Sequence, residues 1–372
     1  MEQYAMDVEL LDKPEQDENA NVQEDLTERL QQFFTEYHIK GTVSKVSIGP
    51  VLSLYSFTPA PGVRVQRVKD IEDDIPFRLH LKEIRVTLQS EKGIIELEIP
   101  NNNRRTIRER EIIDTEDFKE WDSNLTIAMG VDVNGTPVFE DLATIPHLLV
   151  TGDSGSGKTN WLYSTVLSIL YRYSPKECQL LIFDPTMVNW NMFNGIPHLM
   201  TPVVNDPETT AEFLSWLLRE MGQRYTKMNK VGVRNIETYN KQAKENGEET
   251  IPYIVCVIDE IANFMLECRG LAENLMQQVI SQGRAAGVLL IVASQYQYRE
   301  VVPQTIQSSI PARLMFYTMN DRIATEFLGE KGVDKLQMYG DMLYKPIGVK
   351  AVRLHSPYIP DDELDRVLDS IK

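Results

Sequence analysis

The chain has 372 residues and a formal net charge of −17, and its 42% hydrophobic and 25% charged residues are typical of a globular protein with two or three domains. No apolar run approaches the roughly 18–20 residues of a membrane span, and the N-terminus lacks the basic and apolar regions of a signal peptide. Its three cysteines are far apart and lack the spacing of a zinc site. These features predict a cytoplasmic protein with neither a membrane-spanning segment nor a structural zinc site.

An acidic segment begins the chain. Residues 1–28 contain ten acidic residues and one lysine, which together account for −9 of the net charge. Residues 1–23 are predicted to be an acidic disordered tail, because few apolar groups accompany these charges. The tail could be a docking segment for a protein partner, a mimic of DNA or a solubiliser, and the sequence leaves all three open. The remaining −8 belongs to the rest of the chain, so global charge does not exclude a local contact with DNA.

Residues 24–110 are predicted to form a small α+β domain. Residues 24–34 have apolar side chains at helical spacing, which predicts an amphipathic helix whose apolar stripe packs on its own domain. Residues 41–100 contain short apolar runs separated by Gly and Pro, which predicts strands, among them 63–68 and 94–99. Residues 101–125 are polar and charged and are expected to bridge to the next domain.

Residues 111–372 are predicted to form a second, larger domain. From about residue 126, buried-strand patterns alternate with helical patterns, which predicts an α/β fold with a mostly parallel sheet covered on both faces. The expected strands are 127–131, 147–151, 179–184, 253–259, 288–293 and 313–318. The expected helices are 158–171, 207–229, 235–245, 271–284 and 322–329. Such sheets bind their ligands at the carboxyl ends of the strands.

A phosphate-binding motif, G-x-x-x-x-G-K-[ST], follows the expected strand 147–151 and opens an expected helix. Its residues are Gly152, Asp153, Ser154, Gly155, Ser156, Gly157, Lys158 and Thr159. The glycines let successive backbone N–H groups face a β-phosphate, and the helix adds its positive N-terminal end. Lys158 is expected to reach the β- and γ-phosphates, and the Thr159 hydroxyl to ligate Mg²⁺. The motif predicts a nucleotide-binding protein.

Two carboxylates end the apolar run 254–258. Asp259 could hold Mg²⁺ through a water molecule, and Glu260 could polarise the water that attacks the γ-phosphate. An acidic residue at the end of a strand often only caps a turn. Together with a phosphate loop upstream, however, the pair predicts a P-loop enzyme that hydrolyses ATP.

Three further residues have alternative interpretations. Ser294 and Gln295 follow the apolar run 288–293, where polar residues could sense the γ-phosphate or could only cap a turn. Arg284 ends the expected helix before that run, where an arginine commonly complements the helix dipole. In a ring of subunits, Arg284 could instead reach into a neighbour's nucleotide site, where such arginines raise turnover by about 10³–10⁵.

Several ordered motifs make residues 37–365 resemble the FtsK/SpoIIIE family of DNA translocases. They lie at residues 49–50, 59–63, 184–187, 195–199, 223–225, 232–235, 284–287, 310–313 and 340–344. The resemblance implies a RecA-like motor, preceded by a small domain, that forms a hexameric ring around double-stranded DNA and pumps it at the expense of ATP. It also implies that Arg284 lies at the subunit boundary, with Arg313 as the reserve candidate.

The chain also departs from the family pattern. The family's membrane-spanning N-terminus and C-terminal winged-helix module are expected to be absent. Thr186, Tyr296 and Gln307 stand where the family commonly has basic residues that contact phosphates, and a lysine near residues 320–321 is missing. Nearby residues that could substitute, or could be ordinary surface or packing residues, are Tyr296, Tyr298, Arg299, Arg322, Lys331 and Lys335. We expect a weak grip on DNA unless other subunits or a partner compensate.

Three functional hypotheses follow from the sequence. The first is a ring-forming, DNA-dependent ATPase that moves along double-stranded DNA. The second keeps the ATPase but moves protein or an assembly factor. It is motivated by the positions at which the family's phosphate-contacting basic residues are replaced. The third is a non-catalytic, ATP-gated scaffold whose ring binds protein partners through the acidic tail.

Overall fold

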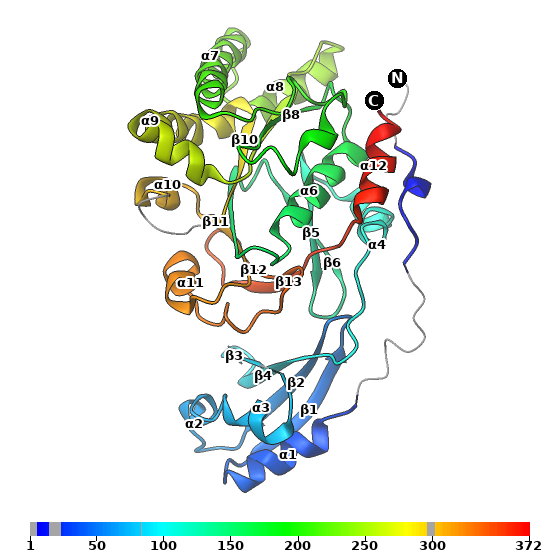
Figure 1. The fold of residues 1–372 in the computed structure, drawn as a ribbon, viewed down its shortest axis with the longest axis vertical. Helices are drawn as coiled ribbons and strands as arrows, with labels where there is room; N and C mark the ends of the chain where they lie inside the picture. Colours follow the sequence, from blue (N-terminus) through cyan, green and yellow to red (C-terminus); the bar gives the residue numbers. More distant parts are fainter. Residues whose placement is uncertain (1–5, 15–23, 83, 296–301) are drawn as a thin grey trace. The chain divides into compact units, whose positions relative to one another are not determined.

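The computed structural model describes residues 6–14, 24–82, 84–295 and 302–372 (Figure 1). The chain divides into two compact units. The smaller unit comprises Pro14–Ile107 and Val131–Pro137, and the larger unit comprises Met1–Lys13, Arg108–Gly130 and Val138–Lys372. Among the helices of the described residues, none has the length and apolar character that crossing a membrane requires.

The smaller unit is built on a four-stranded antiparallel sheet. In spatial order its strands are β1 (Gly41–Ile48), β2 (Leu52–Pro59), β4 (Ile94–Pro100) and β3 (Arg85–Gln89). Its helices are α1 (Thr27–Glu36), α2 (Val65–Lys69) and α3 (Asp74–Leu79). The ring of Phe34 on α1 stacks on Phe57 of β2 with centroids 4.0 Å apart. The apolar stripe of the first helix therefore packs on its own unit, as predicted.

One expected strand of the smaller unit is a helix. Residues 63–68 were predicted to be extended, but Val65–Lys69 forms α2. Val65 and Val68 are three positions apart, a spacing that suits a helical turn as well as a strand. Val68 is fully buried against the unit's core, whereas Val65 is 40% exposed. Burial of this one side chain by a single turn satisfies the apolar pattern.

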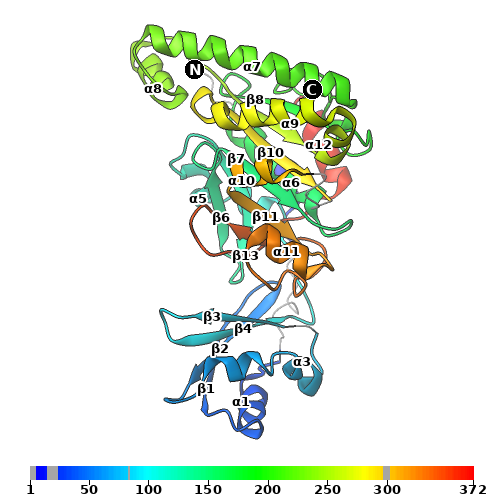
Figure 2. The same cartoon turned by 90° about the vertical axis from the view of Figure 1, so that its left-hand side faces the viewer.

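The larger unit contains a nine-stranded sheet, and the predicted α/β fold is confirmed (Figure 2). In spatial order its strands are β6 (Pro137–Asp141), β5 (Thr126–Asp132), β13 (Val352–His355), β12 (Asp341–Lys345), β11 (Ala312–Phe316), β7 (His147–Thr151), β10 (Val288–Ser294), β9 (Tyr253–Ile258) and β8 (Cys178–Phe183). The five strands from β11 to β8 are parallel, and β11, β12 and β13 pair antiparallel.

The helices of the larger unit are mostly those expected. They are α4 (Arg110–Ile113), α5 (Glu116–Glu120), α6 (Lys158–Arg172), α7 (Pro207–Lys230), α8 (Ile236–Asn246), α9 (Ile261–Ala286), α10 (Gln304–Ser309), α11 (Asp321–Leu328) and α12 (Asp361–Asp369), with short 3-10 turns η1 (Val8–Leu10) and η2 (Asn191–Phe193). α7 and α9 lie side by side (Figure 2). The polar stretch 101–125, expected to be a bridge, contains α4 and α5.

α9 begins ten residues earlier than the expected helix 271–284. Ile261, Phe264 and Met265 are buried at helical spacing, so this part of the chain gains a core contact by becoming helical. The backbone at Arg269 has φ 24° and ψ −110°, which breaks the helix into two segments just before Gly270. The sequence pattern predicted only the second of these two helical segments.

The strand order brings three strand ends together. β7 lies between β11 and β10, and β10 in turn pairs with β9. In the register of these pairs, Ser294 of β10 lies opposite Thr151 of β7, and Val292 lies opposite Ile258 of β9. The segments that leave β7, β9 and β10 therefore start at one edge of the sheet, which is where ligands bind in folds of this kind.

The described part of the acidic segment differs from the disorder expected for residues 1–23. Residues 6–14 include η1, which lies against α12 (Figure 1), and the side chain of Leu11 is only 1% exposed. The Glu9 carboxylate pairs with Arg110, and Asp12 accepts a hydrogen bond from Arg366 at 2.7 Å. Basic partners on α4 and α12 thus hold these acids, while residues 1–5 and 15–23 lie outside the described residues.

Candidate nucleotide-binding site

The phosphate loop runs from the end of β7 into the start of α6. Gly157, the residue before α6, has φ +106°, a conformation that favours glycine. A Cβ atom at this position would lie 2.5 Å from the backbone nitrogen of Gly340. That nitrogen donates a hydrogen bond to the carbonyl of Ser156 at 2.8 Å. The loop therefore has a fixed shape that a side chain at position 157 would destroy.

The loop presents backbone and buried polar groups in the way that a bound phosphate requires. Ser154 and Gly155 are exposed at its tip, while the hydroxyl of Ser156 is buried and makes no hydrogen bond within the described residues. The first turn of α6 offers N–H groups that have no partner inside the helix. These residues fit an anionic ligand such as a nucleotide phosphate.

The Asp153 side chain holds the loop in place through two hydrogen bonds. Its Oδ1 accepts a hydrogen bond from the Thr318 hydroxyl at 3.0 Å, and its Oδ2 accepts one from the amide of Met319 at 3.0 Å. Both partners follow β11, which pairs with β7 on the side opposite β10. Asp153 thus ties the phosphate loop to the neighbouring strand end.

Lys158 is a buried cation at the start of α6. Its side chain is only 6% exposed, and its Nζ lies 3.9 Å from Oε2 of Glu260. Burial lowers the pKa of Lys158, while the negative charges of Asp259 and Glu260 oppose this change. A buried ammonium group beside a helix N-terminus is suited to the added negative charge of a phosphate.

Asp259 and Glu260 leave β9 as predicted, and both are buried. Burial raises the pKa of Asp259, and the nearby Lys158 acts in the opposite direction. The backbone of Glu260 is left-handed, with φ 62° and ψ 68°, a conformation that costs a residue other than glycine about 1–3 kcal/mol. Strained backbone of this kind is concentrated at functional sites.

The Glu260 carboxylate is held by two groups at the end of β10. Its Oε1 accepts a hydrogen bond from the Ser294 hydroxyl at 3.0 Å, and its Oε2 accepts one from the backbone amide of Gln295 at 2.9 Å. Gln295 was a candidate because of its side chain, but that residue is exposed and its main chain makes the contact. Ser294 was named with Gln295 as a polar residue at this strand end, and the adjacency of β9 and β10 brings its hydroxyl to Glu260.

Arg284 lies far from the Glu260 carboxylate of its own chain. It is exposed near the C-terminal end of α9, whereas Glu260 precedes the first residue of the same helix. Glu260 follows the end of β9, whereas Arg284 precedes the start of β10, the parallel strand beside β9, so the two residues lie at opposite edges of the sheet. Arg284 therefore points to solvent at the far end of the helix from the site.

Arg313, the reserve candidate, is already engaged within its own unit. Its guanidinium donates to the carbonyl of Phe327 and, at 2.8 Å, to that of Gln307, and it lies over the Phe327 ring. Burial lowers the pKa of Arg313. These contacts hold Arg313 within its own unit, whereas Arg284 is exposed, which favours Arg284 over Arg313 as the candidate.

Trp190 contacts the candidate metal-binding carboxylate and escaped the sequence analysis. Its indole Nε1 donates to Oδ2 of Asp259 at 3.0 Å, and the residue is fully buried. Trp190 lies on the loop that follows β8, next to β9 in the sheet. A tryptophan in a loop has no sequence signal that distinguishes this role from ordinary packing.

The residues considered for contact with DNA differ in how accessible they are. Thr186 donates to Asp184, and Gln307 donates to the Val302 carbonyl at 2.8 Å, so both serve local structure. Arg322 and Lys331 are exposed, and Lys335 is half-buried. Tyr296, Tyr298 and Arg299 lie outside the described residues.

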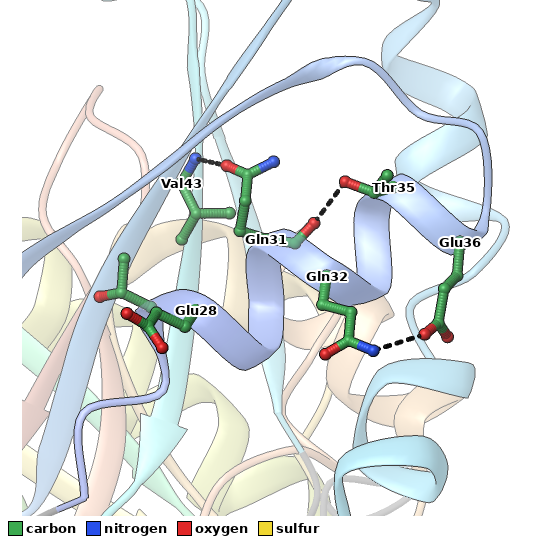
Figure 3. A pocket seen from close by; sticks show the side chains of 7 residues that line it. Glu28, Gln31, Gln32, Thr35, Glu36 and Val43 are labelled. Carbon is green, nitrogen blue, oxygen red and sulfur yellow. Dashed lines mark hydrogen bonds between the residues drawn. The ribbon is translucent and has the colours of Figure 1, made fainter.

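A hollow on the smaller unit, between α1 and β1, lacks the features of a nucleotide site (Figure 3). Its polar groups bond to one another: Gln31 accepts from the amide of Val43 at 2.9 Å, and Gln32 donates to Glu36 at 2.9 Å. The carboxylates of Glu28 and Glu36 would repel a phosphate. Its lining residues are Thr27, Glu28, Gln31, Gln32, Thr35, Glu36 and Val43.

Comparison with known sequences identifies relatives over almost the whole chain. The sequence model of the FtsK/SpoIIIE family matches residues 110–299, and that of the FtsK alpha domain matches residues 7–101. The DNA translocase FtsK of Brucella melitensis biotype 1 is 36% identical over 366 residues, which cover 91% of this chain and 45% of the relative. The DNA translocase FtsK of Helicobacter pylori strain J99 is 36% identical over 351 residues, which cover 94% of this chain and 41% of the relative. The chain thus spans less than half the length of these relatives.

Two solved structures illustrate the proteins that share this fold. The pCW3 conjugation coupling protein TcpA, in its monomer form with ATPγS, has a TM-score of 0.63 at 19% identity and matches over 95% of this chain and 100% of its own. The cytoplasmic domain of the type VII secretion ATPase EccC of Thermomonospora curvata has a TM-score of 0.61 at 20% identity, over 72% of this chain and 34% of its own. At these identities the likeness shows a shared fold.

Proposed function

The chain belongs to the FtsK/SpoIIIE family, and from this premise we propose that it is an ATP-hydrolysing motor that moves along double-stranded DNA. One observation carries the proposal: β7, β9 and β10 bring the phosphate loop, Lys158 and the Glu260 carboxylate to one edge of the sheet. The curated relatives are named DNA translocases, which supports DNA as the substrate of movement.

In this proposal the backbone of residues 152–159 binds the β-phosphate of ATP. Lys158, buried beside Glu260, contacts the β- and γ-phosphates and neutralises charge that develops during cleavage. The adjacent N-terminus of α6 adds to this positive potential. The ATPγS bound to the structural relative TcpA supports nucleotide as the ligand of this fold.

Thr159 and Asp259 are the residues that would hold magnesium, Thr159 through its hydroxyl and Asp259 through a water molecule. A bound Mg²⁺ would supply the positive charge that stabilises the phosphate oxygens. Glu260 accepts a proton from the attacking water and orients it. The amide of Gln295 and the hydroxyl of Ser294 hold Glu260 before ATP arrives, so Gln295 can report a change in this carboxylate to the segment that follows it.

The exposed Arg284 completes a neighbour's site in a hexameric ring. Its place at the edge of the sheet opposite Glu260 supports action on another subunit, because a change of side-chain conformation does not span the length of a strand. An arginine supplied in this way stabilises the transition-state charge. A ring built like this couples each hydrolysis step to a subunit boundary.

Three further assignments accompany the motor. The chain comprises an acidic tail over residues 1–23, a small α+β domain over 24–110 and a RecA-like motor domain over 111–372. The family matches to residues 7–101 and 110–299 support a boundary near residue 110. The protein works in the cytoplasm, and a protein partner binds through the acidic tail.

A triphosphatase assay with and without linear duplex DNA tests the proposed function. The motor predicts at least a several-fold rise in turnover with duplex, and a ring-sized particle when a non-hydrolysable ATP analogue is present. Because binding to DNA is salt-dependent, the assay covers a series of salt concentrations. Turnover that no nucleic acid stimulates at any salt concentration would contradict a DNA translocase and support an ATPase that moves protein.

A further inference from the structure

A single carboxylate organises the loop that follows β8. Asp184 is fully buried, and its Oδ1 accepts a hydrogen bond from the amide of Thr186 at 3.0 Å. Its Oδ2 accepts from the amides of Asn189 at 3.0 Å and Trp190 at 3.3 Å. The position of the Trp190 backbone is therefore fixed by the residue that follows β8, the edge strand of the sheet.

The Trp190 ring is fixed by aromatic packing on the phosphate-loop helix. It lies edge-on to Tyr163 of α6, with centroids 5.0 Å apart, and packs on Phe193 at 4.9 Å. The Tyr163 hydroxyl donates to the carbonyl of Asn189, the residue before Trp190. Aromatic pairs of this kind add about 0.5–1.5 kcal/mol each to the burial of the rings. The indole thus has one orientation relative to α6.

This fixed indole restrains the carboxylate of Asp259. The Trp190 N–H donates to Oδ2 of Asp259 at 3.0 Å, which uses one of the roughly four lone-pair sites of the carboxylate and leaves the sites of Oδ1 for a metal-bound water. A buried carboxylate without such a partner could rotate about its side-chain bonds. The hydrogen bond removes this freedom, and it ties the orientation of Asp259 to α6, whose second residue is Thr159.

We propose that Trp190 is a positioning residue that sets the magnesium affinity of the site through its hydrogen bond to Asp259. The inference rests on the proposed function, in which Thr159 and Asp259 hold magnesium. Residues that hydrogen-bond to metal-ligating groups commonly change metal affinity by 10–100-fold when they are removed. Trp190 acts through Asp259 and contacts neither the nucleotide nor the metal in this account.

The test measures binding of a fluorescent, slowly hydrolysed ATP analogue to the full chain as a function of free Mg²⁺. Trp190→Phe removes the N–H but retains a ring to pack on Tyr163 and Phe193. The half-saturating Mg²⁺ concentration is expected to rise about tenfold, while the affinity for the analogue in EDTA changes less than about twofold. Trp161→Phe is the matched control. Like Trp190, Trp161 is fully buried, but it lies on α6 and its indole N–H donates to the carbonyl of Met129.

Two further variants separate positioning from a loss of stability. In an Asp259→Asn background, Trp190→Phe is expected to have no additional effect on the Mg²⁺ dependence. Tyr163→Phe, which only loosens the loop, is expected to shift the dependence in the same direction by a smaller factor. An unchanged Mg²⁺ dependence in Trp190→Phe, or an equal shift with and without Asp259, would overturn the role of Trp190 alone. Failure of the parent chain to bind the analogue with Mg²⁺ would overturn the proposed function as well.

Discussion

The ammonium of Lys158 lies 3.9 Å from the Glu260 carboxylate, across the edge of the sheet where β7 and β9 end. Glu260 is held there by the end of β10, the strand between them. The cation proposed to bind phosphate and the proposed base for water thus share one electrostatic environment before any nucleotide binds. A bound γ-phosphate attracts Lys158 and thereby weakens the attraction between Lys158 and Glu260. Nucleotide binding is in this way linked to release of the Glu260 carboxylate from Lys158.

The Glu260 carboxylate is predicted to serve hydrolysis and not binding. Glu260→Gln keeps hydrogen-bonding oxygen and shape but cannot accept a proton, so turnover should fall by about 10²–10⁴ while ATP still binds. Steady-state hydrolysis and equilibrium binding measure the two effects. Glu267→Gln, an exposed residue on the same helix, is the control and should leave both unchanged. Unchanged turnover in Glu260→Gln would favour the ATP-gated scaffold.

Arg284 is predicted to act on a neighbouring subunit. Arg284→Ala should abolish hydrolysis and leave ATP binding intact, because the residue is far from the nucleotide of its own chain. Mixing this variant with Glu260→Gln should restore part of the activity, since some boundaries then pair an intact arginine with an intact glutamate. Arg219→Ala, exposed on α7, is the control. Loss of ATP binding in Arg284→Ala, or no recovery on mixing, would contradict action across a boundary.

The phosphate loop is predicted to reject a side chain at position 157. Gly157→Ala places Cβ 2.5 Å from the backbone nitrogen of Gly340, so the loop must move and nucleotide binding should be lost. Gly247→Ala is the matched control, because Gly247 also has positive φ but no atom lies within 4 Å of the added carbon. The control should cost only the backbone strain of about 1–2 kcal/mol in the free energy of unfolding. Nucleotide affinity and denaturant unfolding measure both effects, and equal results for the two variants would refute the steric account.

Glu109, buried at the start of α4, is predicted to make stability depend on pH. Burial raises its pKa to about 8, with help from the Glu363 carboxylate, so the folded chain keeps a proton that the unfolded chain loses above its ordinary pKa. The free energy of unfolding should therefore fall as pH rises from 4.5 to about 8, by up to about 1.4 kcal/mol per pH unit.

Glu109→Gln isolates this effect, because the amide cannot ionise. Relative to the parent, its free energy of unfolding should be similar at pH 5 and higher at pH 8. Urea unfolding at both values measures the difference, and Glu116→Gln, 79% exposed on α5, is the control. A constant difference between parent and Glu109→Gln at the two pH values would show that Glu109 does not titrate in this range.

The sequence predicted the parts of the site that are encoded locally. The glycines and Lys158 of the phosphate loop have a fixed spacing, and Asp259 and Glu260 directly follow an apolar run, so motif and periodicity sufficed. Trp190 could not be found in this way, and neither could the contact of Ser294 with Glu260. Their roles depend on which strands are neighbours, and a loop tryptophan or a strand-end serine has the same local pattern in many proteins.

The fold shows the same division between local and tertiary information. The alternation of strands and helices predicted the mostly parallel sheet, but β12 and β13 were not expected, because they have only 5 and 4 residues and pair antiparallel. Residues 6–14 were expected to be disordered from their charge. Their structure depends on Arg110 and Arg366, which composition alone cannot place beside them.

Equilibrium binding of ATP in the presence of Mg²⁺ tests the central claim most directly. The account predicts that the purified chain retains one adenine nucleotide per polypeptide, and that Lys158→Ala, which removes the buried ammonium, loses this binding. Failure of the parent chain to retain ATP with Mg²⁺ supplied, or retention that Lys158→Ala leaves unchanged, would contradict it.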